Sequence, residues 1–264
     1  MKTVESYIEE YKALKLNEVV DYNKFNEYAI TAHSTQVEGS TLSIEETSLL
    51  IDEGTTPKGK PLAHSLMVKD HHNALQMVLK FGKDSTPLNL KTICLINEAV
   101  MKNTGKKYNT ALGTVDSSKG ELRKGSVFVQ KRYFPAYNKV PDLLNKLCEQ
   151  LSEKISDKLS LREQINLSYS AHLNLVSIHP HYDGNGRTSR LLMNMIQNSF
   201  ALPLSVVYNE DKLEYFKALE ESRDSESLIP FYEFMDQQYI KYLSLEINRF
   251  NNQMNKRSGM ALLF

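Results

Sequence analysis

Apolar residues recur every three or four positions along almost the whole chain, the spacing of helices with one buried face. Gly and Pro residues separate the apolar segments and indicate where the helices end. We predict helices over residues 3–15, 22–38, 43–53, 63–82, 88–103, 139–155, 160–178, 187–200, 211–221 and 228–250. The one clear strand pattern lies in Val127-Phe128-Val129 and, after a short polar break, in residues 132–134, which predicts a short hairpin closed by Pro135. We therefore expect an all-α bundle with one short β-hairpin.

The length and charge of the chain exclude several classes of function. Its 264 residues suffice for one large or two small domains. The formal net charge is +0 and no Lys/Arg-rich run stands out, so we expect no nucleic-acid partner. No stretch is long and apolar enough to span a bilayer, so we expect no membrane association. Cys94 and Cys148 each lie in a helical apolar pattern, which favours buried thiols in the reducing cytoplasm over a disulfide.

Residues 179–190, His-Pro-His-Tyr-Asp-Gly-Asn-Gly-Arg-Thr-Ser-Arg, are the most informative segment. Pro180 disfavours the helical conformation at His179, so the preceding helix should end there. Gly184 and Gly186 permit positive φ angles, which would let successive N–H groups converge on an anion. A new apolar periodic run follows at once and predicts a helix that begins at this anion-binding turn.

The charged side chains of this segment indicate phosphate chemistry. Arg187 and Arg190 lie on one face of the first helical turn, where cations oppose the helix dipole and call for a compensating anion. A polyphosphate on the helix N-terminus would satisfy both arginines. Asp183 is then placed to hold a divalent cation, and His179 is the nearby group suited to accept a proton. The pattern predicts a phosphoryl- or nucleotidyl-transfer site.

The segment resembles the signature of the Fic family, His-Pro-Phe-x-Asp-Gly-Asn-Gly-Arg-x-x-Arg, and departs from it only at His181, where the family has Phe. Members mostly transfer AMP from ATP to a protein hydroxyl. The resemblance implies a Fic-type helical bundle that modifies a Ser, Thr or Tyr of a target protein and of itself. Doc-type kinases of the family carry Lys at the place of Gly186, so the Gly favours nucleotidyl transfer over phosphoryl transfer.

The resemblance also implies a role for each signature residue. His179 would be the general base, and Asp183 would bind Mg²⁺. The ATP phosphates would be held by Gly184, Asn185, Gly186, Arg187 and Arg190. The hairpin stands at the place of the family's flap, and its residues Val127, Phe128 and Val129 would pair with an extended segment of the target. The position of the hairpin relative to the signature is the only support for this role. The alternative is a hairpin that fastens the loop to the bundle and binds no partner.

A second constellation lies at residues 34–39, where Glu38 occupies the last turn of a helix and a carboxylate is disfavoured by the dipole. Alone, such a Glu is usually an exposed residue that tolerates a small penalty. Here Ser34-x-x-x-Glu38-Gly39 matches the inhibitory motif of the family. By resemblance, Glu38 would pair with Arg190 and exclude the γ-phosphate, as in self-inhibited single-chain members.

The resemblance extends from about Tyr22 to Tyr232 and suggests three regions. We expect an N-terminal helical region over residues 1–75 with the inhibitory helix at about 22–39, a Fic catalytic core over 76–240, and a C-terminal helical tail over 241–264. The sequence does not identify the target protein, and it leaves a homo-oligomer open.

Three other interpretations were weighed. His179-x-His181-x-Asp183 resembles the start of a dinuclear zinc hydrolase box, but no His follows residue 181 to complete two metal shells. A catalytically silent nucleotide-binding module is disfavoured because the whole signature set is present. An enzyme that removes AMP, with Glu38 orienting a water, cannot be separated from the transferase by sequence. The aromatic residues Tyr208, Tyr215 and Phe216 are equally consistent with an adenine pocket and with the core.

Overall fold

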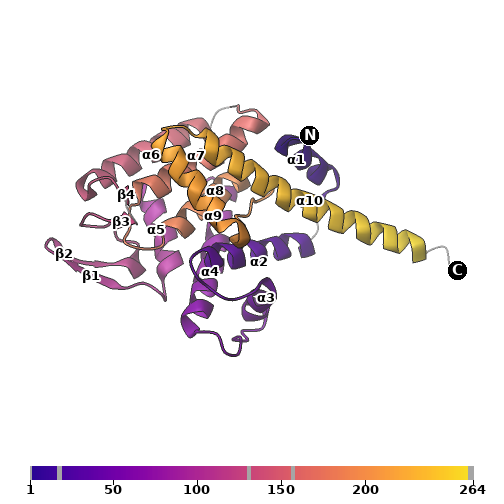
Figure 1. Ribbon diagram of the computed structural model, residues 1–264, viewed down its shortest axis with the longest axis horizontal. Helices are drawn as coiled ribbons and strands as arrows, with labels where there is room; N and C mark the ends of the chain where they lie inside the picture. Colours follow the sequence, from indigo (N-terminus) through magenta and orange to yellow (C-terminus); the bar gives the residue numbers. More distant parts are fainter. Residues whose placement is uncertain (1, 17–19, 130–131, 156–157, 261–264) are drawn as a thin grey trace.

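The computed structural model describes residues 2–16, 20–129, 132–155 and 158–260, except for the side chains of residues 20, 21, 129 and 253–260. Its α-helices are α1 (Val4–Ala13), α2 (Val20–Val37), α3 (Ile44–Asp52), α4 (Leu62–Lys83), α5 (Leu90–Met101), α6 (Val140–Ile155), α7 (Leu161–Ile178), α8 (Asn185–Ser199), α9 (Lys212–Asp224) and α10 (Ile229–Met260). Each predicted helix is present, and the predicted all-α class is confirmed (Figure 1).

The helices begin where the sequence provides capping groups. Ser43 and Ser160 each accept a hydrogen bond from the backbone N–H three residues on, and a Glu at that position bonds back, so α3 and α7 both start with a capping box. Thr3 and Asn89 cap α1 and α5 with their side-chain oxygens. Local sequence therefore fixes where these helices start, before any tertiary contact.

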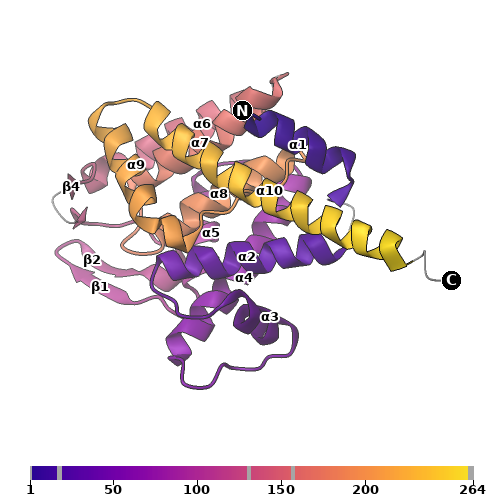
Figure 2. The same ribbon diagram turned by 45° about the vertical axis from the view of Figure 1, so that its right-hand side comes forward.

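Helix α8 is the centre of the bundle. Nearly every residue from Asn185 to Gln197 is buried, because α7, α4, α5 and α2 all pack against α8. Helix α10 crosses the bundle beside α9, packs on α1 and α7, and projects beyond the rest of the molecule at its C-terminal end (Figure 2). Unpaired polar side chains are costly on a helix that is buried on all sides, so partners for its arginines and asparagines must come from neighbouring elements or from a ligand.

Two antiparallel hairpins lie at one end of the bundle (Figure 1). The expected hairpin is present as β3 (Phe128–Val129) and β4 (Arg132–Tyr133). The expectation of a single hairpin is wrong, because β1 (Lys107–Thr110) pairs with β2 (Gly113–Asp116) in a second one. Its strands are largely exposed, so they lack the alternation of apolar and polar residues by which strands are recognised in a sequence.

Both expected region boundaries fall inside continuous helices. Residues 75 and 76 lie within α4, and residues 240 and 241 lie within α10. Of the expected C-terminal tail, residues 261–264 lie outside the described residues.

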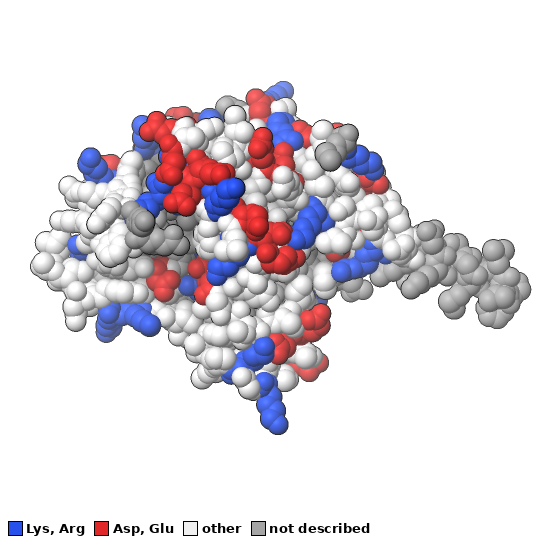
Figure 3. Space-filling view, in the orientation of Figure 1, with Lys and Arg blue, Asp and Glu red and all other residues white. Residues whose placement is uncertain are grey.

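The cysteines, the helix hydrophobicity and the surface charge bear on the remaining expectations. Cys94 and Cys148 are free thiols, and burial raises the pKa of each to about 11. Over the described ranges, the helices are all too short or too polar to cross a membrane. Charged side chains of both signs are interspersed on the face shown in Figure 3, consistent with a formal net charge of +0.

Candidate active site

The turn between α7 and α8 has the conformation that its sequence predicts, with one exception. Helix α7 ends at Ile178, as predicted from Pro180. His179 adopts the left-handed conformation with φ 53°, which is uncommon for a residue other than glycine. Gly184 is the N-cap of α8 with φ 79°. Gly186 was expected to have a positive φ as well, but it lies in the first turn of α8 and is helical.

The side chain of Asn185 shapes the turn. Its Oδ1 accepts a hydrogen bond from the His181 N–H at 3.0 Å, and its Nδ2 donates to the His181 carbonyl at 2.9 Å. Both ends of the amide bind the loop, so the prediction that Asn185 helps to hold phosphate rests on its backbone N–H. The N–H groups of the first turn of α8 have no intrahelical acceptors, so the backbone is the part suited to an anion.

His181, the one departure from the signature, is fully buried in this turn. Its Nδ1 lies 3.1 Å from the carbonyl oxygen of Glu121. Burial lowers the pKa of His181 to about 4, so the ring is neutral at physiological pH. A neutral imidazole can thus occupy an interior position where the family has Phe.

Two residues that the sequence analysis did not assign to the site hold the turn in place. Arg123 is 2% exposed and donates from Nε to the His179 carbonyl at 2.8 Å. Its backbone N–H donates to the Pro180 carbonyl at 3.0 Å. Asn97 of α5 donates to the Asp183 carbonyl at 3.0 Å. In the sequence, only the position of Arg123 just before the hairpin could have indicated that it holds this turn.

The imidazole of His179 lies under the hairpin. The Phe134 ring, just after β4, stacks on it with centroids 4.0 Å apart. Burial lowers the pKa of His179 to about 4, with a further contribution from the charge of Arg123. The ring is therefore neutral near pH 7 and able to accept a proton.

A small cavity of about 190 Å³ opens beside this imidazole. Val176, Leu219 and Phe216 give it apolar walls, and the carboxylate of Glu220 lies among them. Of the three aromatic residues considered for an adenine pocket, only Phe216 lines this cavity.

Arg187 is buried in the first turn of α8 with unused donors. Its Nη2 lies 3.1 Å from the sulfur of Met101 and 3.5 Å from the Asp183 carboxylate. Its Nε and Nη1 are buried and have no hydrogen-bond partner within the described part of the chain. Burial lowers the pKa of Arg187, as expected for a cation without full compensation. Such a guanidinium is suited to receive an anionic ligand.

Arg190 is also buried, at 3% exposed, but each of its three nitrogens has a partner. Nε donates to the Ser34 hydroxyl at 2.8 Å, and Nη2 donates to the Ser34 carbonyl at 2.9 Å and to the Glu38 carboxylate at 2.7 Å. Nη1 lies 3.3 Å from the Tyr215 hydroxyl, which is 3.0 Å from Nε2 of the buried His172. The expected Glu38–Arg190 ion pair is thus present, and Tyr215 with His172 supports the guanidinium from α9 and α7.

Glu38 lies directly over the start of α8. A Cβ built on Gly186 would stand 2.5 Å from Glu38 Oε1, so only glycine at this position lets the carboxylate approach so closely. Burial alone would raise the pKa of Glu38, but the charges of Arg190 and Arg187 outweigh it and lower the pKa below its ordinary value. An ionised carboxylate therefore occupies the position where a helix N-terminus binds anions.

Asp183 presents a carboxylate at the edge of this anion site. Its side chain is 49% exposed, and Oδ1 accepts a hydrogen bond from the Gly184 N–H at 2.6 Å. Among the residues that the structure describes, no three carboxylate, His or Cys side chains form a metal-binding group. A single half-exposed carboxylate beside a phosphate site nevertheless fits Mg²⁺, which commonly binds one or two carboxylates together with substrate phosphates.

Comparison with known proteins agrees with this geometry. Residues 87–197 match the model of the Fic/DOC family. The chain carries a Fic/DOC domain. The matched range contains the turn from His179 to Arg190, whereas Ser34 of α2 and Glu38 directly after this helix lie outside it.

Curated relatives are longer than this chain. It is 27% identical over 207 residues to "Protein adenylyltransferase Fic" of Drosophila willistoni, which is 77% of this chain and 38% of the relative. The protein of the same name from Aedes aegypti is 28% identical and likewise covers 77% of this chain and 38% of the relative. The chain therefore spans about two fifths of the length of these relatives.

Solved structures share the fold around the Fic domain. A Fic domain containing signaling protein from Bacteroides thetaiotaomicron superposes with a TM-score of 0.77 at 22% identity, covering 93% of this chain and 96% of the other. Fic-1 from C. elegans gives a TM-score of 0.72 at 20% identity, covering 95% and 72%. The Fic-type helical fold predicted from the sequence is confirmed.

The Glu38–Arg190 contact predicts a stability effect. Glu38→Ala leaves the buried Arg190 with neutral partners only, and the Glu38 side chain itself is 31% exposed, so part of the loss is screened by solvent. We expect the free energy of unfolding to fall by about 1–2 kcal/mol. Urea denaturation measures it, with Glu53→Ala at the exposed end of α3 as control. Equal stability of both variants would mean that the ion pair contributes nothing.

Proposed function

We propose that the protein is an adenylyltransferase that transfers AMP from ATP to a Ser, Thr or Tyr hydroxyl of a target protein, and that Glu38 inhibits it. The observation that carries the proposal is a neutral, partly buried His179 beside a helix N-terminus with two buried arginines. The names of the curated relatives support the same activity.

His179 supplies the base in this proposal. The target hydroxyl oxygen attacks the α-phosphorus of ATP while the imidazole accepts the hydroxyl proton. The bond between the α-phosphorus and the bridging oxygen breaks, and pyrophosphate leaves. Arg123 fixes the backbone carbonyl of His179, so the ring is oriented by contacts that lie outside the reacting groups.

The start of α8 holds the phosphates. Backbone N–H groups of its first turn, the unused donors of Arg187 and the guanidinium of Arg190 together compensate the negative charge. Mg²⁺, held by Asp183 and phosphate oxygens, would neutralise charge on the phosphates when bound. The purine would lie in the apolar cavity beside His179, between Phe216 and Leu219.

The β3–β4 hairpin would receive the target. Phe128 and Tyr133 are 67% and 78% exposed, and their rings lie 5.8 Å apart on the hairpin. Exposed aromatic residues on a short two-stranded sheet are suited to bind an extended peptide beside the strand edge. Of the three expected flap residues, the side chain of Val129 lies outside the described residues.

Inhibition follows from the position of Glu38. Its carboxylate lies against Gly186 and Arg190, where the terminal phosphate of ATP would bind. Two anions cannot share this site without strong repulsion. ATP therefore binds productively only after Glu38 has left.

A labelling assay tests the reaction. ATP labelled at the α-phosphate should label protein, whereas ATP labelled at the γ-phosphate should not. His179→Ala should abolish labelling but leave ATP affinity largely intact, because the phosphate contacts lie on α8. Protein labelled from the γ-phosphate would identify a kinase, and loss of ATP binding together with activity would remove His179 from the role of base.

Glu38→Gly should raise the rate of transfer, including self-modification, at least about tenfold, since it frees Arg190 for the nucleotide. Incorporation of α-label by the variant and the wild type measures this, with Glu53→Gly as the matched control. A variant no faster than wild type would refute self-inhibition. If the variant instead loses an AMP-removing activity that the wild type has, the reverse reaction is the better account.

The pKa of His179 predicts the pH profile. Because this pKa is about 4, the imidazole is deprotonated and active at neutral pH and becomes protonated only as the pH falls toward that value. We expect kcat/KM of the Glu38→Gly variant to be constant between about pH 6 and 8 and to fall below about pH 5. A fall centred near pH 6.5, the ordinary pKa of histidine, would contradict the buried environment.

A further inference from the structure

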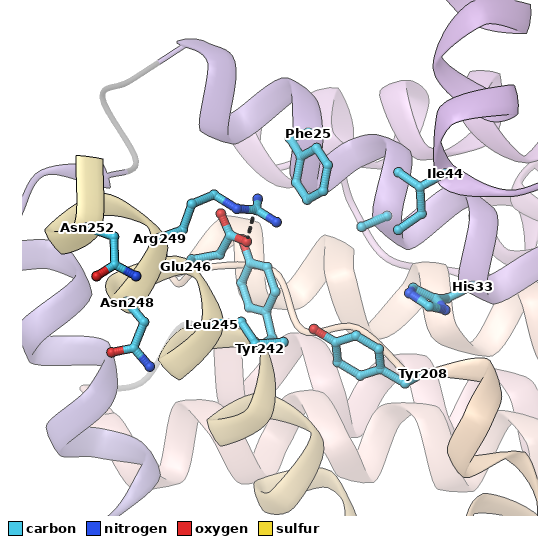
Figure 4. Close-up of a pocket in the computed structure, with 11 residues that line it drawn as sticks. Phe25, His33, Ile44, Tyr208, Tyr242, Leu245, Glu246, Asn248, Arg249 and Asn252 are labelled. Carbon is cyan, nitrogen blue, oxygen red and sulfur yellow. Dashed lines mark hydrogen bonds and ion pairs between the residues drawn. The ribbon is translucent and has the colours of Figure 1, made fainter. Parts of the chain in front are cut away.

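A second and larger cavity, of about 610 Å³, lies between α2 and α10. Figure 4 shows Phe25 and His33 of α2 and Ile44 of α3 approaching it from one side, and Tyr242, Glu246 and Arg249 of α10 from the other. No residue of the turn from 179 to 190 lines it, and neither do Ser34 and Glu38. The cavity is therefore separate from the candidate active site but shares α2 with it.

The α2 wall of this cavity is one face of the helix. Phe25, Ala29 and His33 follow one another at intervals of four residues and so lie on the same side. The His33 ring packs against Tyr208 with centroids 4.8 Å apart, and its Nδ1 accepts a hydrogen bond from the Asn209 N–H at 3.3 Å. The two rings thus form one aromatic wall of the cavity, against which a flat ring could stack.

The α10 wall carries an incompletely paired acid. Glu246 is 3% exposed, and its Oε1 accepts a hydrogen bond from Arg249 Nη1 at 3.0 Å. Its Oε2 has no hydrogen-bond partner within the described part of the chain. Buried carboxylate oxygens are normally paired, so this oxygen is an acceptor in need of a donor. Arg249 stands at the cavity edge over the Phe25 ring at 4.3 Å, and its side chain, 44% exposed, can turn aside to admit one.

We propose that this cavity binds a flat heteroaromatic molecule with an N–H donor, which stacks among Phe25, His33 and Tyr208 and donates to Glu246. Such a molecule contacts α2 and α10 together, so it binds only while α2 is docked. It therefore stabilises the arrangement in which Glu38 covers the start of α8. This consequence for activity rests on the proposed function, whereas the binding itself does not.

The size of the effect follows from linkage. A ligand that binds only the docked state lowers the equilibrium constant for release of α2 by the factor 1 + [L]/Kd. At a concentration of three times Kd, release of α2 should be about fourfold rarer. The transfer rate of the wild type should fall by the same factor, while Glu38→Gly should be unaffected because its site is already open.

Binding is tested with two matched probes in ligand-observed NMR titrations: indole, which has the N–H donor, and 1-methylindole, which lacks it. We expect saturable binding of indole and at least fivefold weaker binding of 1-methylindole. Ala29→Phe and Leu245→Phe, which fill the cavity from α2 and α10, should each abolish binding. Leu213→Phe, at an exposed position on α9 outside the cavity, should leave it unchanged.

The proposal is overturned if indole does not bind, if both probes bind equally, or if binding persists in both cavity-filled variants. Using two filled variants from different helices guards against a single one that fails to fold.

Coupling to α2 is measured by hydrogen exchange of the α2 amides, which needs no enzymatic activity. Indole at three times its Kd should slow this exchange about fourfold in the wild type. If hydrogen exchange of the α2 amides is unchanged while indole is bound, the proposed coupling between the cavity ligand and the docking of α2 is overturned. If exchange slows but no variant transfers AMP, the proposed function fails while the ligand site stands.

Discussion

A buried cation at the N-terminal end of a helix is the constraint around which this structure is organised. Arg190 lies in the second turn of α8, close to the end where the helix dipole is unfavourable for positive charge, and it is almost fully removed from water. Without an anion its burial would be costly. Ser34 of α2 and Glu38 directly after it supply the compensation, so the docking of α2 is coupled to the charge of Arg190.

Arg187, the second arginine near the start of α8, is also buried, but its guanidinium is only partly paired. Arg187 has two buried nitrogens without partners among the described residues, so the apo site retains capacity for an anion even while Glu38 is present. The turn that carries both arginines is held rigidly by Arg123 and Asn97, which bond its carbonyls rather than any reacting group. A preorganised turn with a displaceable carboxylate is suited to a reaction that must remain off until α2 moves.

Helix α2 thus connects the start of α8 with the larger cavity. Its C-terminal end covers the start of α8, and one of its faces lines the larger cavity against α10. In the proposed scheme, a molecule that fills this cavity stabilises the docked helix and thereby limits the access of a nucleotide to Arg190. A ligand of the larger cavity would need no contact with the turn at residues 179–190. It would act because its affinity for the docked position of α2 exceeds its affinity for the released position.

The sequence by itself determined the features that neighbouring residues encode. Helical periodicity, capping boxes and the turn at Pro180 and Gly184 are local, so the helices and the anion-binding turn could be predicted, and the motif at Ser34–Glu38 indicated the partner of Arg190. Tertiary structure alone decided the rest. The exposed β1–β2 hairpin lacks a buried face, and the need for glycine at position 186 comes from the approach of Glu38 rather than from its own φ. Tyr215 and His172 meet Arg190 because α7, α8 and α9 pack together, and such contacts between distant segments leave no periodic signal in the sequence.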